Sequence, residues 1–146
     1  MIDISWAVLL QLTLTKTTPL LLTASGGLLS ERSGVINIAL EGMMLAGAFG
    51  SIVGATQTGS PWVGLLAGGL LGAALGALHA VCSVYYGADQ IVGGTAINLL
   101  AIGGTGFLLF TLFGTHGSSS SASKLDLLHV GSIGFYSTTI LSILFL

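Results

Sequence analysis

The sequence predicts an all-α membrane protein with about four complete transmembrane helices and the start of a fifth. Three properties of the 146-residue chain support this: 53% of its residues are hydrophobic, only 5% are charged, and 23 are glycine. A soluble surface needs several times this density of charge. Glycine destabilises helices in water, whereas small residues allow membrane helices to pack closely. We therefore expect the helices to be surrounded by membrane lipid.

Composition also excludes several classes of function. Three basic residues in the whole chain are too few to neutralise a phosphate backbone, which excludes a nucleic acid partner. Cys82 is the single cysteine, so no intrachain disulfide can form, and its apolar neighbours indicate a packing residue. His116 and His129 lack other ligand types at metal-site spacing. We expect neither a metal site nor a cofactor.

The first predicted span covers about residues 6–29. Pro19 removes a backbone hydrogen bond and is expected to kink this helix. Lys16 must pair, extend to the interface or face a cavity, and Glu41 in the next span has the opposite charge. Alternatively, residues 6–16 lie along the membrane surface as an amphipathic piece, and only the later residues enter the lipid.

The second predicted span covers about residues 35–57. Asn37 and Glu41 interrupt its apolar run, and in a continuous helix this spacing places both on one face. An ionisable residue in a membrane helix is costly and usually faces a protein interior or an aqueous path, so Glu41 is a functional candidate. The alternative is a structural role, near the interface or paired with a neighbouring helix.

The third predicted span, about residues 62–86, has a small residue at every fourth position, and the second span has a similar row. Such rows allow two helix backbones to approach each other, so they predict packing faces. His79 has no second histidine or carboxylate one turn away, which favours a hydrogen-bond donor over a proton relay. The glycines assigned to helix packing are Gly42, Gly50, Gly64, Gly68, Gly72 and Gly76.

The fourth predicted span, about residues 91–114, has a polar stripe. Gln90, Gly94 and Asn98 recur every four residues, and Thr105 continues the same face. The stripe predicts either hydrogen bonds between helices or the lining of a transport path.

The serine-rich segment 115–138 is predicted to be an exposed loop. The partial fifth span, residues 137–146, would cross only about half of a bilayer. We therefore expect this sequence to be the front part of a longer protein.

Two long blocks, Thr18–Phe49 and Ala88–Phe107, resemble the permease subunits of bacterial ABC importers of the simple sugar and nucleoside type. That family is related to the ribose and branched-chain amino acid permeases. Gly87 departs from the pattern, because family members often have a basic residue there. The family's members are also longer and have a second set of helices. The resemblance therefore implies that residues 1–146 form the N-terminal part of a transmembrane permease domain.

The resemblance implies a multi-pass protein of the bacterial plasma (inner) membrane that takes part in ATP-driven import of nucleosides or simple sugars. The implied partners are a second permease subunit, a separate ATP-binding subunit and an extracytoplasmic solute-binding protein. No phosphate-binding loop motif occurs in the chain, so we expect it not to be an enzyme itself. The competing interpretation is a small oligomeric channel or secondary carrier without an ATPase. Four residues are candidates for the substrate pathway: Asn37, Glu41, Thr95 and Asn98.

Overall fold

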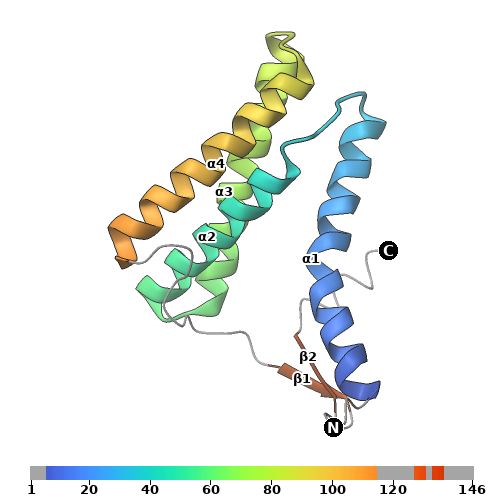
Figure 1. The fold of residues 1–146 in the computed structure, drawn as a ribbon, viewed down its shortest axis with the longest axis vertical. Coiled ribbons are helices and arrows are strands. Elements are labelled where there is room, and N and C mark those ends of the chain that lie inside the picture. Colours follow the sequence, from blue (N-terminus) through green and yellow to red (C-terminus); the bar gives the residue numbers. More distant parts are fainter. Residues whose placement is uncertain (1–5, 115–126, 131–132, 137–146) are drawn as a thin grey trace, which may run out of the picture. The chain divides into compact units, whose positions relative to one another are not determined.

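The computed structural model describes residues 6–114, 127–130 and 133–136 (Figure 1). The chain divides into two compact units, Gly27–Lys124 and Met1–Gly26 with Leu125–Leu146, and each is described by itself. The elements in chain order are α1 (Trp6–Arg32), α2 (Leu40–Thr58), α3 (Pro61–Ala80), the π-helical turn η1 (Val81–Tyr85), α4 (Gln90–Phe113), β1 (Leu127–Val130) and β2 (Ile133–Tyr136).

Helix α1 satisfies many of its polar side chains within itself. Four hydroxyls donate to the carbonyl oxygen four residues earlier at 2.7–2.8 Å, namely those of Thr13, Thr18, Thr23 and Ser25. Such bonds allow hydroxyl groups to remain in a helix that has no water around it. The predicted pair of Lys16 with Glu41 stays a prediction, because these residues lie in different units.

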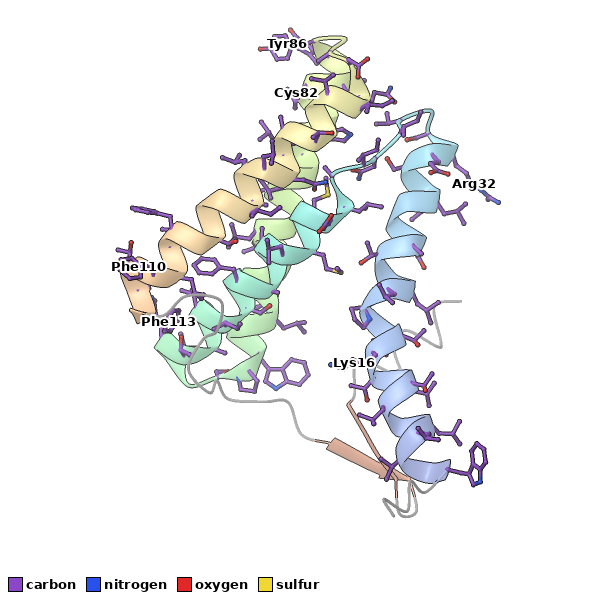
Figure 2. All side chains as sticks on the ribbon, viewed as in Figure 1. Lys16, Arg32, Cys82, Tyr86, Phe110 and Phe113 are labelled. Carbon is purple, nitrogen blue, oxygen red and sulfur yellow. The ribbon has the colours of Figure 1, made fainter. Side chains whose placement is uncertain are left out.

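In the unit Gly27–Lys124, α2 packs along α3 and also contacts α4 (Figure 1). Gly59 ends α2 with a positive φ of 67°, and its N–H donates to the Ala55 carbonyl at 2.9 Å. Pro61 then begins α3, where its missing N–H costs nothing. Asp89 caps α4 by accepting hydrogen bonds from two first-turn N–H groups, each at 2.9 Å. Figure 2 shows Phe110 and Phe113 at the opposite end of α4 from Tyr86.

The interior of this unit consists mainly of small residues, while the large apolar side chains point outward. Ala46, Ala55 and Ala101 are buried, whereas Leu70 is 71% and Phe107 69% exposed. A water-soluble domain has the opposite arrangement, with its large apolar residues inside. Close packing through small residues, with leucine and phenylalanine outside, is typical of helices in lipid.

Two of the described helices are long and apolar enough to cross a membrane: α3 with its π-helical turn, Pro61–Tyr85, and α4. Helices α1 and α2, with 27 and 19 residues, are long enough as well but less apolar. Polar residues such as Lys16 in α1 and Glu41 in α2 lower their hydropathy. Membrane crossing by α1 and α2 therefore stays a prediction.

The prediction of an exposed loop over residues 115–138 was wrong for its last part. Strands β1 and β2 pair antiparallel, with Leu127 opposite Tyr136 and Val130 opposite Ile133. Their apolar and aromatic residues favour strands, and the sequence between them is Gly-Ser, a dipeptide typical of two-residue hairpin connections. The predicted partial helix 137–146 lies outside the described residues.

Candidate functional site

The residues Gly34–Ala39, here called the connecting segment, are not helical, although a helix was predicted from residue 35. Gly34 has a φ of 86°, which an L-residue with a side chain rarely adopts. Asn37 accepts a hydrogen bond from the Ala39 N–H at 3.1 Å, a local Asx turn that competes with helix formation. Helix α2 therefore begins only at Leu40, and the prediction that Asn37 and Glu41 share one helix face was wrong.

Asn98 on α4 caps the N-terminus of α2 from a different helix. Its Oδ1 accepts from the Gly42 N–H at 2.7 Å, and its Nδ2 donates to the Ile38 carbonyl at 3.0 Å. The N-cap residue Ala39 has no side chain able to do this. The first N–H groups of a helix have no partner within the helix, so Asn98 satisfies one of them. A Cβ at Gly42 would lie 2.9 Å from the Asn98 Cα, so glycine permits this approach.

Gln90 binds the connecting segment in the same way, two turns earlier on α4. Its Oε1 accepts from the Ile36 N–H at 2.7 Å, and its Nε2 donates to the Gly34 carbonyl at 3.5 Å. Between the two amides, a Cβ at Gly94 would lie 3.2 Å from the Ala39 nitrogen. We call Gln90, Gly94 and Asn98 the α4 clamp. The polar stripe of the fourth predicted span thus binds backbone, which needs partners wherever lipid replaces water.

Helix α3 also contacts the connecting segment. The His79 Nε2 lies 3.4 Å from the Ile36 carbonyl oxygen, and His79 is only 2% exposed. Asn37 donates from Nδ2 to the Met43 sulfur at 3.8 Å, and Met43 in turn faces Gly72 on α3. The sequence could not predict that His79 contacts Ile36. Every residue has a backbone carbonyl, so the residue type does not show which carbonyl accepts a hydrogen bond.

The four predicted pathway residues fall into two groups. Asn37 and Asn98 both lie at the connecting segment, with their side-chain oxygens bound to backbone N–H groups. Glu41 and Thr95 are exposed. The Thr95 hydroxyl donates to the Ile91 carbonyl of its own helix at 2.9 Å and can still accept a hydrogen bond. No basic group pairs with the Glu41 carboxylate in the part of the chain that the structure describes.

The predicted packing glycines differ in how closely their neighbours approach. A Cβ at Gly50 would lie 2.5 Å from the Leu71 Cδ1, and one at Gly64 would lie 2.7 Å from the Ser51 carbonyl oxygen. Gly68 is equally tight, against Ser51 Oγ and the Gly47 carbonyl oxygen. At Gly72 and Gly76 the corresponding distances to Met43 are 3.5 and 3.8 Å, ordinary van der Waals contact. The tightest α2–α3 contacts are thus nearer the Gly59 loop.

We expect Gly94→Ala to loosen the connecting segment, because the new methyl group would press on Ala39 and Ile38. Overpacking of this kind typically costs about 1–3 kcal/mol. The measurement is hydrogen exchange of the amides of residues 36–42, together with the melting temperature. Gly93→Ala is the matched control, because a Cβ there meets nothing within 4 Å. Equal effects of the two changes would contradict the α4 clamp.

Comparison with known proteins places this architecture in a family. The family model described as branched-chain amino acid transport system / permease component matches residues 9–146. The guanosine ABC transporter permease protein NupQ of Bacillus subtilis is 43% identical over 114 residues, which cover 74% of this chain and 36% of that protein. The nucleoside ABC transporter permease protein NupC of Lactococcus lactis is 46% identical over 91 residues, 58% of this chain and 29% of that protein.

A third relative, from Haloferax volcanii, is provisionally named a glucose ABC transporter permease protein and is 42% identical over 99 residues, 68% of this chain and 30% of that protein. The chain thus spans about a third of the length of these relatives. No solved structure matches it significantly. The family match over almost the whole sequence, together with an interior of small residues and lipid-type exposed faces, shows that the chain is a membrane protein belonging to the branched-chain amino acid transport system permease family.

Proposed function

We propose that this chain is part of the permease subunit of an ATP-driven importer for nucleosides, with simple sugars as the second candidate cargo. Residues 1–146 would form the N-terminal part of its transmembrane domain, crossing the bacterial plasma membrane several times. ATP hydrolysis would take place on a separate subunit, and a second permease subunit and an extracytoplasmic solute-binding protein would complete the transporter. The observation that carries this proposal is the 43% identity to a relative named as a guanosine permease.

The geometry at the start of α2 supports a transport path there. Irregular backbone at membrane depth is tolerated where it is buried in protein or lines a water-filled cavity. Discontinuous helices also form the binding sites of several transporter folds. Glu41 lies exposed in the first turn of α2, directly after the connecting segment. An ionised carboxylate is too costly to face lipid, so we place Glu41 on the path.

Each of the four candidate residues takes a distinct part in this proposal. Glu41 would accept hydrogen bonds from ribose or sugar hydroxyls, and Thr95 would offer a second acceptor. Asn37 and Asn98 would act indirectly, by holding the backbone that presents Glu41. This division of roles follows from which side-chain atoms already have backbone partners.

The experiment is uptake by cells that express the complete reading frame with its partner genes in a strain lacking other nucleoside uptake. We expect ATP-dependent accumulation of labelled guanosine that unlabelled nucleosides compete for and glucose does not. Competition by glucose alone would instead favour a sugar cargo. Uptake that persists with a catalytically inactive ATPase subunit would contradict the importer and support the channel or secondary carrier.

We expect Glu41→Gln to weaken apparent cargo affinity about tenfold or more, because a hydrogen bond to a charged group contributes about 1.5–3 kcal/mol. The measurement is the initial uptake rate as a function of guanosine concentration, normalised to the amount of protein in the membrane. Glu31→Gln is the control, because Glu31 is exposed in the last turn of α1, before the connecting segment. Wild-type kinetics for Glu41→Gln would remove this residue from the path.

A further inference from the structure

His79 and Ser83 lie four residues apart, at the end of α3 and in the π-helical turn that follows it. They are 2% and 8% exposed. Within the described residues, the His79 Nδ1 and the Ser83 Oγ are both buried and without a hydrogen-bond partner. Buried polar atoms in native proteins nearly always have a partner, from protein or from an ordered water molecule. Two such atoms four residues apart, in two helical elements that follow each other directly, therefore point to a shared ligand.

The other ring nitrogen determines which hydrogen-bonding role the His79 Nδ1 has. The Nε2 lies 3.4 Å from the Ile36 carbonyl oxygen, and a carbonyl oxygen can only accept. A hydrogen bond at this contact therefore needs the proton on Nε2, and in that tautomer Nδ1 is an acceptor. The Ser83 hydroxyl is a donor as well as an acceptor. The two atoms are thus complementary without being bonded to each other.

Ser83 lies in a π-helical turn and not in regular α-helix. The Tyr86 N–H donates to the Val81 carbonyl at 3.2 Å, a bond between residues five apart. A turn of this kind holds one residue more than an α-helical turn, and such turns are frequent at functional sites.

We propose that His79 and Ser83 together bind a single buried water molecule. The water donates one hydrogen to the His79 Nδ1 and accepts the hydrogen of the Ser83 hydroxyl. This arrangement fixes the ring in the Nε2–H form, which is the form that can donate to the Ile36 carbonyl. His79 is then a positioning residue for the connecting segment, and Ser83 acts on that segment through the water. The proposal does not depend on the transported cargo.

The first test is the sign of the stability change in Ser83→Ala, measured on the full chain in lipid nanodiscs. If the hydroxyl has no partner, its removal should raise the melting temperature, because a buried unsatisfied group is destabilising. If it holds the water, its removal should lower the melting temperature by about 2–4 °C. An unchanged or raised melting temperature would overturn the proposal.

The second test uses His79→Gln, whose amide nitrogen takes a position like that of Nε2 but provides no acceptor at the position of Nδ1. We expect the effect of Ser83→Ala to vanish in this background, because the water has lost one of its two partners. An equal effect of Ser83→Ala in both backgrounds would show that Ser83 acts independently of His79 and would overturn the proposal.

The third test measures directly, by NMR, which ring nitrogen of His79 carries the proton. In protein labelled with ¹⁵N-histidine, the signal lost in His79→Gln identifies His79. We expect the Nε2–H tautomer, magnetisation transfer from water to Nδ1, and loss of that transfer in Ser83→Ala. An Nδ1–H tautomer, a doubly protonated ring, or a direct hydroxyl contact without water transfer would each exclude the bridging water.

Discussion

Asn98→Leu is expected to lower the free energy of unfolding by about 2–4 kcal/mol and to abolish uptake. Two backbone groups on the α2 side, the Gly42 N–H and the Ile38 carbonyl, lose their partner at once. Each polar group left without a partner away from water costs about 1–3 kcal/mol, although interhelical bonds in membranes average less than this. The measurement is unfolding in mixed micelles, followed by the exchange of the amides at the start of α2.

Two further variants separate the amide bonds from simple packing. Asn98→Asp keeps the shape and can still accept from the Gly42 N–H, but it places a carboxylate against the Ile38 carbonyl oxygen. We expect it to be nearly as destabilising as Asn98→Leu. Thr95→Val, one turn earlier, removes only a bond within α4 and should change stability by less than about 0.5 kcal/mol. A stable Asn98→Leu protein would refute the capping of α2 by α4.

Gly68→Ala is expected to be the most damaging single methyl group that can be added to α3. The new Cβ would overlap Ser51 Oγ and lie 2.5 Å from the Gly47 carbonyl oxygen, which belongs to helix backbone and cannot turn aside. Helices α2 and α3 must then separate along their tightest contact, at a cost of about 3 kcal/mol or more. The measurement is the melting temperature and the yield of folded protein after solubilisation.

The neighbouring position provides the control for this change. A Cβ at Gly69 meets nothing within 4 Å, and alanine favours helix, so Gly69→Ala should be neutral or stabilising by up to about 1 kcal/mol. Gly72→Ala should also be tolerated, because its closest neighbour, the Met43 carbonyl oxygen, is 3.5 Å away. Similar losses at all three positions would mean that glycine is needed for a reason other than this contact.

Much of the fold could be predicted from the chain alone. The rows of glycine every fourth residue predicted the helix faces, because that spacing follows from helix geometry whatever the partner is. The polar stripe of α4 was also predicted, and Gln90, Gly94 and Asn98 do share one face. Proline, aspartate and glycine start or end a helix through effects on residues close to them in the sequence. Most helix boundaries therefore lie within three residues of the prediction.

The interruption before α2 could not be predicted in this way. Residues 35–39 are mostly apolar and continue the apolar run of α2, so the pattern predicted a helix from residue 35. They stay non-helical because Asn37 forms a local Asx turn and because Gln90 and Asn98, more than fifty residues later, supply the hydrogen bonds that a helix would otherwise provide. Local pattern carries no information about such distant partners. The same limit applies to His79, whose partner is a backbone oxygen.

The sequence by itself determined that this is an all-α membrane protein, where most of its helices begin and end, and which helix faces have residues small enough for close packing. Only the tertiary structure decided what the few polar side chains bind. By the sequence alone, each side-chain amide could equally have bound cargo, another side chain or the main chain. The side-chain amide of Asn98 binds backbone at the start of α2, whereas the charged Glu41 in the first turn of that helix stays exposed.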